Sequence, residues 1–421
     1  MKNTLIFISQ SYLNHATVDA LDAVADYARM VLILPQGEDI DPKIAPFIDE
    51  LYIVEASLTE NIRPVFNLTS LITVITPEIA RVGTPGKVRI FCQQEDNILV
   101  AAQVRQQLNI KGDMPEIIEL FKDKIKMKAA VSNIYPQNIP KHETLDIDRM
   151  CAEPAAYYGY LAENLGEKMI VKPTSAAGSF NVEIVNDIAD FLRVGSMIGQ
   201  DEYQFDYEID EFISGTMYQC DSLVIDGQTT FCSILELGCT NFDFVQGKPL
   251  SVFPAIDKAL YQRLYNFNQA VISELGLTDG SAHHELFIKD QTQEIVFLEI
   301  AARVPGGIGV HFHETNSNIN LIDANLYLTV NKELLAKIQP VPKNNVVSAL
   351  LPVTKGIIKK LNEPDIQSPY AITWYVKEGV EVDCRSLIDT AGVLTFSNDD
   401  IQVLRSDFEK LQAYIPVTTE Q

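Results

Sequence analysis

The sequence lacks the cysteine patterns that hold disulfide frameworks or zinc ions. Its six cysteines are scattered over 421 residues without a C-x-x-C pair, which favours reduced thiols. No apolar run approaches the ~18 to 20 residues that cross a bilayer. The apolar part of the N-terminal MKNTLIFIS is too short for a signal peptide. We therefore expect a protein that stays in the cytoplasm and contacts no membrane.

Basic residues are also scarce. The chain has 33 lysines and arginines against 57 aspartates and glutamates, which gives a net charge of −24. This balance opposes nucleic-acid phosphates and anionic lipid surfaces alike. We expect no nucleic-acid partner, and most of the negative charge is explained by solubility.

The common nucleotide-binding glycine motifs are missing. The turn after the first apolar run reads SQSYLN rather than G-x-G-x-x-G, and G-x-x-x-x-G-K-[ST] occurs nowhere. What is present is an alternation of short apolar runs and helical periods, beginning TLIFIS, VDALDAVADYARM and VLILP. This rhythm predicts an open α/β sheet. Strand patterns dominate the later chain, so the fold class expected is α/β and α+β, with several domains.

Residues 284 to 300 read as a β-hairpin with a carboxylate on each strand. Antiparallel pairing around a central Thr292 would place Leu286 opposite Leu298, and Glu285 opposite Glu299. Two directly opposed carboxylates destabilise a sheet unless something neutralises them. Mg²⁺ or Mn²⁺ would do so, because these ions accept carboxylate oxygens. The alternative, a slipped turn that leaves one glutamate in solvent, has equal weight here.

An arginine and two glycines follow the second glutamate, in FLEIAARVPGG. The planar guanidinium of Arg303 suits recognition of a phosphate or carboxylate. It could equally be an ion-pair partner for Glu299. Gly306 and Gly307 would let the backbone approach a substrate, although a plain turn explains them as well.

Three further stretches carry weak signals when each is taken alone. Lys172 ends an apolar strand before the small residues 174–179, and backbone N–H groups in such a turn can close over phosphates. A simple hairpin is the plainer interpretation. Lys124 would by itself be a solvated helix charge, while Asp210 and Glu211 would lie at an exposed strand edge.

The order of these stretches resembles the ATP-grasp superfamily. The matching elements are the DK of FKDKIKMK, IVKP followed by GS, DEFISG with CDSLVIDG, HHELF, and FLEIAARVPGG, over about residues 95 to 325. The resemblance implies an ATP-grasp fold with an N-terminal open α/β domain and a small C-terminal α+β domain like that of the L-amino-acid (dipeptide) ligases. The domains expected are 1–112 (N-terminal), 113–205 (small ATP-grasp subdomain), 206–340 (large subdomain) and 341–421 (C-terminal).

The resemblance also implies a nucleotide site. Lys124 and Lys172 would contact ATP phosphates. The lid over the phosphates would be Ser175, Ala176, Ala177, Gly178 and Ser179. The adenine pocket would be lined by Asp210, Glu211, Phe212 and Ile213.

By the same resemblance, Glu285 and Glu299 would hold Mg²⁺ (or Mn²⁺), and Arg303 would face the reacting group. His283, Gly306 and Gly307 are weaker substrate candidates. Two departures stand out. The ribose-binding glutamate of many relatives is replaced by Met217 here, and the amide of their E-x-N motif by Ala301.

The function implied is an ATP-dependent ligase that joins small carboxylate and amine substrates through an acyl phosphate, releasing ADP and phosphate. The two alanines before Arg303 resemble those of dipeptide-forming members. A carboxylase, a ligase for the thiol of CoA or a carrier protein, and a non-catalytic ATP-binding protein remain alternatives. A homodimer is left open.

Overall fold

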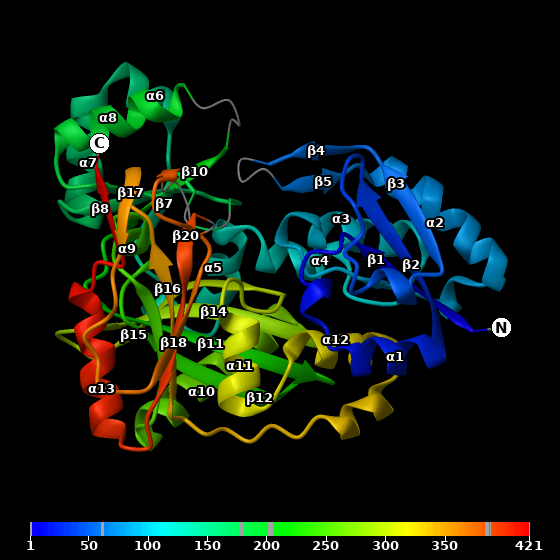
Figure 1. Ribbon diagram of the computed structural model, residues 1–421. Coiled ribbons are helices and arrows are strands. Elements are labelled where there is room, and N and C mark those ends of the chain that lie inside the picture. The colour runs from blue at the N-terminus through cyan, green and yellow to red at the C-terminus, as the bar shows by residue number, and fades with distance from the viewer. Residues whose placement is uncertain are drawn as a thin grey trace.

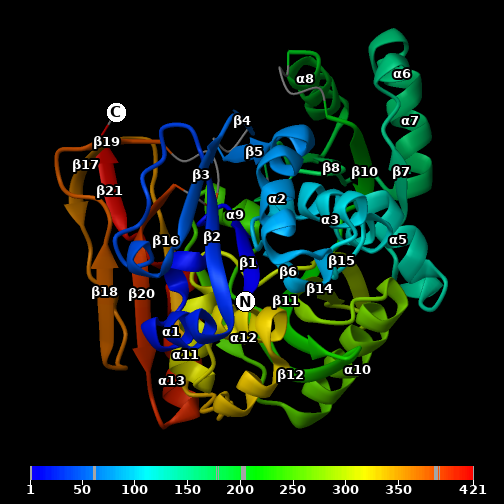
Figure 2. The ribbon, with the colours of Figure 1, turned by 90° about the vertical axis from the view of Figure 1, so that its right-hand side faces the viewer.

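The protein is described by a computed structural model. It covers residues 2–59, 63–176, 178, 180–200, 205–383, 387 and 389–420. The structure has three parts: an N-terminal domain, a small projecting subdomain, and a large sheet that the C-terminal segment extends (Figures 1 and 2). Across the described ranges, no helix is long and apolar enough to cross a membrane.

The N-terminal domain is built on a four-stranded parallel sheet in the order β3-β2-β1-β6. Its central strands are buried on both faces, as their continuous apolar runs require. The strands are β1 (Asn3–Ile8), β2 (Ala28–Pro35), β3 (Glu50–Val54) and β6 (Val88–Phe91), with a separate hairpin of β4 (Ala56–Leu58) and β5 (Pro64–Phe66). The helices are α1 (Val18–Tyr27), α2 (Leu68–Val82) and α3 (Glu95–Leu108).

A second sheet, in the order β7-β10-β8-β9, forms the projecting subdomain with three helices (Figure 2). Its strands are β7 (His142–Thr144), β8 (Met169–Pro173), β9 (Glu183–Val185) and β10 (Tyr207–Glu211), and its helices are α6 (Ile147–Ala152), α7 (Pro154–Leu165) and α8 (Ile188–Ile198). Strand β10 pairs with both β7 and β8. This sheet therefore continues past the boundary expected at residue 205.

The largest sheet has eight strands in the order β15-β14-β11-β12-β13-β16-β20-β18. Five come from the expected large subdomain: β11 (Gly215–Ile225), β12 (Gln228–Leu237), β13 (Leu250–Pro254), β14 (Gly280–Lys289) and β15 (Ile295–Ala301). Three come from the C-terminal segment: β16 (Val346–Pro352), β18 (Tyr370–Trp374) and β20 (Thr390–Ser397). Because β13 pairs with β16, the sheet crosses the boundary expected at residue 340.

Helices cover this sheet and connect it to the N-terminal domain. The helices are α4 (Pro115–Ile118), α5 (Lys124–Ser132), α9 (Asn241–Val245), α10 (Lys258–Leu275), α11 (Gly309–Ser317), α12 (Leu321–Val330) and α13 (Ile401–Lys410). Helix α12 shares one apolar core with α1 and the N-terminal sheet. A last small sheet is formed by β17 (Gly356–Leu361), β19 (Glu381–Val382) and β21 (Val417–Glu420).

The hairpin of β14 and β15 pairs Glu285 with Glu299. The pairing beyond Glu285 differs from the expected register. Leu286 lies opposite Phe297 rather than Leu298, because the register shifts between Glu285 and Leu286. One extra residue in β15 explains the difference, since a bulge moves every pair on one side of it by one position. The prediction was right for the carboxylates and wrong for the apolar pairs.

Gly215 allows β11 to approach β14 closely. A Cβ at this position would lie 2.3 Å from the carbonyl oxygen of Ile288, a backbone atom that cannot rotate away. We expect Gly215→Ala to lower the free energy of unfolding by about 1–3 kcal/mol through overpacking. Urea unfolding followed by circular dichroism measures the change.

Gly159→Ala is the matched control. Gly159 lies inside helix α7 with no heavy atom within 4 Å of the new methyl group. Alanine there should stabilise the protein by about 0.5–1 kcal/mol. Equal stability changes for the two variants would contradict the close approach.

Candidate active site

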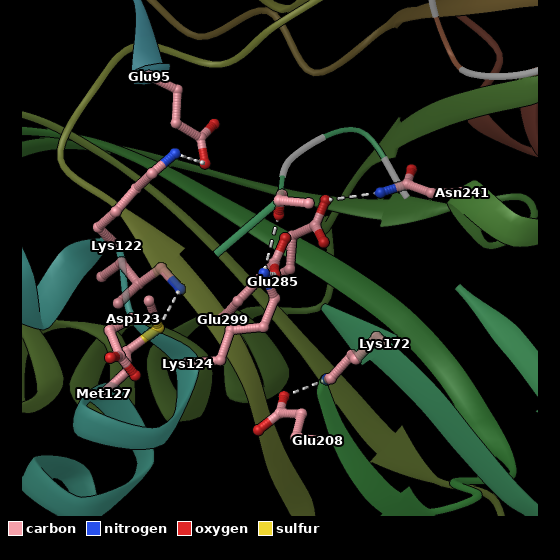
Figure 3. A network of polar contacts seen from close by, with 12 residues as sticks. Glu95, Lys122, Asp123, Lys124, Met127, Lys172, Glu208, Asn241, Glu285 and Glu299 are labelled. Carbon is pink, nitrogen blue, oxygen red and sulfur yellow. Dashed lines mark hydrogen bonds and ion pairs between the residues drawn. The ribbon is translucent and has the colours of Figure 1, made fainter. Parts of the chain in front are cut away.

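A cavity of about 420 Å³ lies between the small subdomain and the large sheet. Both sheets contribute to its walls. Figure 3 shows a network of polar contacts that includes the lining residues Lys124, Lys172, Asn241, Glu285 and Glu299. The predicted residues that line it are Lys124, Lys172, Ala176, Gly178, Asp210, Glu211, Phe212, Ile213, Glu285 and Glu299. Ser175 is exposed and does not line it. Ala177 and Ser179 lie outside the described residues.

The two opposed glutamates lie at one wall of this cavity (Figure 3). The Asn241 amide donates to Glu285 over 3.2 Å, and the Lys124 ammonium is 3.1 Å from Glu299. Lys124 also donates to the Ala176 carbonyl at 3.1 Å. Burial raises the pKa of Glu299, but Lys124 and Lys172 outweigh it and hold that pKa below its ordinary value. Glu299 therefore stays ionised, and both carboxylates line the cavity.

The carboxylates fit a Mg²⁺ site that is completed by substrate. No group of three or more His, Cys, Asp or Glu side chains among the described residues is arranged around a metal. Mg²⁺ is commonly held by one or two carboxylates together with phosphate oxygens and water. Glu285 and Glu299 supply such a pair, and Ala301 adds no oxygen from its side chain.

A buried cluster of four charges, which we call the charge quartet, lies behind the cavity. It consists of Lys128, Lys172, Glu208 and Asp210. The Lys128 ammonium is 2.7 Å from Asp210 and 3.0 Å from Glu208, and Lys172 is 3.0 and 3.3 Å from the same carboxylates. Burial lowers the pKa of Lys128. The positive charge of the neighbouring Lys172 lowers that pKa further. Two positive and two negative groups make the quartet neutral, which is what permits its burial.

The quartet changes the picture of Asp210. The resemblance assigns this residue to the adenine pocket, and it does line the cavity. Its carboxylate, however, accepts hydrogen bonds from Lys128, so its main contacts are ion pairs. These contacts position Lys172. Burial lowers the pKa of this lysine, but Asp210 and Glu208 outweigh burial and raise the pKa above its ordinary value. Lys172 therefore stays charged at the cavity wall.

The far end of the cavity is apolar and bounded by backbone. The Phe212 N–H donates to the Lys168 carbonyl at 3.2 Å, and the Lys168 ammonium lies 3.6 Å from the centre of the Phe212 ring. Met217 is buried at this end. Other apolar walls are Ile170, Ile184, Phe287 and Leu298. This end suits a flat aromatic base better than a charged group.

Arg303 lies outside this cavity, at the seam with the N-terminal domain. Its guanidinium forms a two-pronged ion pair with Glu95, at 2.7 Å from Nε and 2.6 Å from Nη2. The expected alternative partner, Glu299, is therefore not its ion-pair partner. Burial raises the pKa of Glu95, but Arg303 and Lys122 outweigh it and hold that pKa at about 2.

The glycines after Arg303 also lie at this seam rather than in the cavity. A Cβ on Gly306 would lie 3.5 Å from the Tyr12 hydroxyl, and one on Gly307 would lie 3.2 Å from Leu350. Gly307 has a φ of 55°, which disfavours other residues. The loop thus lies beside Arg303 without lining the nucleotide cavity.

His283 belongs to a buried chain of polar groups. Its Nδ1 is 2.6 Å from Asp221, whose other oxygen is 2.8 Å from Nε2 of His313. The Nε2 of His283 lies 3.5 Å from Glu285. Burial lowers the pKa of His283, but Asp221 and Glu285 raise it to about 9. At neutral pH the imidazole is protonated, so it orients Glu285 as a donor and is poorly suited to act as a base.

Several residues of the site were missed in the sequence. Lys128 follows Lys124 by four positions, on the same helix face, and Glu208 precedes Asp210 by two positions, on the same strand face. Both spacings were visible in the sequence. Glu95, in contrast, is 208 positions from Arg303, and no local pattern connects them.

Comparison with known proteins agrees with this geometry. Residues 165–311 match the family model of the ATP-grasp domain. The chain contains an ATP-grasp domain. The computed ATP-grasp structure also superposes over its whole length on the crystal structure of an L-amino acid ligase from Bacillus licheniformis, with a TM-score of 0.70, 15% identity and full coverage of both chains.

Two further proteins are similar to this chain. The L-arginine-specific L-amino acid ligase of Bacillus subtilis is 25% identical over 323 residues, which are 76% of this chain and 73% of that one. The biotin carboxylase domain of the 2-oxoglutarate carboxylase from Hydrogenobacter thermophilus, solved with MgADP, has a TM-score of 0.60 at 13% identity, covering 99% of this chain and 91% of that one. The predicted fold class and superfamily are confirmed.

The charge quartet makes Lys128 important for stability. Lys128→Met keeps most of the side-chain volume but leaves two buried carboxylates with one cation. We expect the free energy of unfolding to fall by about 3–5 kcal/mol, as measured by urea unfolding. Lys126→Met, on the exposed face of the same helix, should change the free energy of unfolding little. A similar small loss for both variants would contradict a tightly coupled quartet.

The Glu95–Arg303 pair should make stability depend on pH in the acid range. The pKa of Glu95 is lowered from 4.5 to about 2, so the pair contributes above pH 4.5 and is lost as the pH falls towards 2. The difference corresponds to at most roughly 3 kcal/mol. We expect the stability difference between wild type and Glu95→Gln to be largest at neutral pH and to shrink in acid, in urea unfolding series.

The exposed Glu167 offers a matched control for that series. Glu167→Gln should differ little from wild type at any pH. A stability difference for Glu95→Gln that stays constant from neutral pH down to about pH 3 would show that the carboxylate charge is not responsible.

Proposed function

We propose that the protein is an ATP-dependent ligase that joins a small carboxylate substrate to an amine, releasing ADP and phosphate. The observation that carries this proposal is the convergence of Lys124, Lys172, Glu285 and Glu299 on one cavity. Its apolar end suits a base and its charged end suits phosphates. The similarity to an L-amino acid ligase over three quarters of the chain supports amino-acid-like substrates.

The proposed chemistry begins with attack of a substrate carboxylate oxygen on the γ-phosphorus of ATP. The bond to the β,γ-bridging oxygen breaks, giving an acyl phosphate and ADP. The amine then attacks the acyl carbon, phosphate leaves, and the amine loses a proton to form the amide. Catalysis of the first step is mainly positioning and charge neutralisation.

Each charged side chain has a task in this scheme. Lys124 and Lys172 would neutralise phosphate oxygens. Glu285 and Glu299 would hold Mg²⁺, which when bound offsets charge on the transferring phosphoryl group. Arg303, held in orientation by Glu95, would receive the carboxylate substrate and then stabilise the oxyanion. Arg303 does not line the nucleotide cavity, but it lies within electrostatic range of Glu299, so a carboxylate held by it would lie beside the phosphates.

The site's lysines provide the sharpest test of this function. We expect Lys124→Met to reduce carboxylate-dependent ADP release by about 10²–10³-fold, because one cation at the phosphates is lost. ADP and phosphate are measured with Mg²⁺, ATP and pairs of amino acids. Lys126→Met, two residues along the same helix and exposed, should keep wild-type turnover.

Product mass separates this proposal from its rivals. An amide of two amino acids supports the ligase, whereas incorporation of bicarbonate or of a thiol would identify the other reactions. Nucleotide-dependent thermal stabilisation without any ADP release would leave only a binding protein. Full turnover in Lys124→Met or Arg303→Ala would contradict the assigned site.

A further inference from the structure

A second cavity, of about 470 Å³, lies at the seam between the N-terminal domain and the large sheet. Strand β6 and the loop 111–113 form one wall, and residues 277–281 with helix α12 form the other. It shares no lining residue with the nucleotide cavity. The proposed reaction makes no use of it.

Two arginines in this cavity donate hydrogen bonds to backbone carbonyls. The Arg105 guanidinium donates only to backbone carbonyls, those of Ile90 at 3.2 Å and Asp113 at 3.3 Å. Arg89 likewise donates to two backbone carbonyls, at 2.8 and 2.9 Å. Within the described part of the chain, neither forms an ion pair. Such unpaired cations are unexpected in a protein with 57 acidic and 33 basic residues.

The cavity also holds a carboxylate, Asp113, that Arg105 attracts electrostatically without forming a direct ion pair with it. Asp113 is half-buried, and in the ranges that the structure describes its side chain forms no ion pair. The other acid, Asp279, is neutralised by Lys332 at 2.7 Å. Burial raises the pKa of Asp113, and the nearby Arg105 offsets this only in part. Charged groups of both signs therefore line one partly open cavity.

We propose that this cavity is a binding site for a zwitterionic amino acid or short peptide. The ligand's carboxylate would pair with Arg89 and Arg105, and its ammonium group with Asp113. A ligand with only one charge would leave one of these buried groups unpaired, which is unfavourable. The volume is within the usual range for small-molecule sites.

The position of the cavity connects it to the proposed active site. Gln93 and Ala302 line it, and the Gln93 side chain accepts a hydrogen bond from the Val304 N–H at 3.0 Å. Glu95 follows Gln93 by two residues, and Arg303 lies between Ala302 and Val304. A bound ligand would therefore stabilise the domain interface that orients Arg303, which makes this a regulatory site.

Isothermal titration of the full chain with the common L-amino acids and with dipeptides tests this inference. We expect at least one of these zwitterions to bind, and its binding to weaken by at least about 10-fold in Asp113→Asn and in Arg89→Gln. Arg193→Gln, an exposed arginine on α8, is the matched control and should bind as wild type does. Binding that also persists in Arg303→Ala would place the ligand away from the proposed active site.

Acetate and ethylamine, each with one charge, are the comparison probes. Neither should compete with the zwitterion at similar concentrations. Acetate binding as tight as the zwitterion would overturn the proposal in favour of a simple anion site. Zwitterion binding that is weaker than about 10 mM, or unchanged in Asp113→Asn and Arg89→Gln, would overturn it outright. These outcomes are independent of ADP release, so they do not depend on the proposed ligase activity.

Discussion

The opposition of Glu285 and Glu299 across one strand pair is the constraint on which the candidate site depends. Like charges so close are unfavourable in a sheet, and the structure surrounds them with cations rather than separating them. Lys124 approaches from helix α5, and the protonated His283 flanks Glu285. The pair therefore draws α5 to the end of β15 and fixes where a divalent ion and phosphate would lie.

The lysine on the opposite wall of the cavity is also held in place by charges that neutralise it. Lys172 projects from the small subdomain into the cavity, but Glu208 and Asp210 hold it there, and Lys128 balances the second carboxylate. The strand alternation of β10 puts both acids on one face. The charge at the cavity wall and the buried charge behind it are thus one network, and the cost of burying it is offset only while all four members remain.

The seam between domains carries the rest of the candidate chemistry. Arg303 leaves the large subdomain and pairs with Glu95, at the start of helix α3. The second cavity borders the same seam through Gln93 and Ala302. Ligands bound on either side of this domain interface would share one set of contacts. A nucleotide, an acyl substrate and an amino-acid effector would therefore influence one another through it.

The sequence by itself determined the local features: apolar runs as strands, the order of motifs, and the glutamates that face each other. Their pairing was predicted in the right place even though a bulge at Leu298 changed the apolar register, because both depend on one hairpin. Tertiary structure alone decided that Arg303 meets Glu95, that Lys128 completes a buried quartet, and that the C-terminal strands extend the large sheet. Those outcomes depend on packing between segments far apart in the chain, and local periodicity contains no information about such contacts.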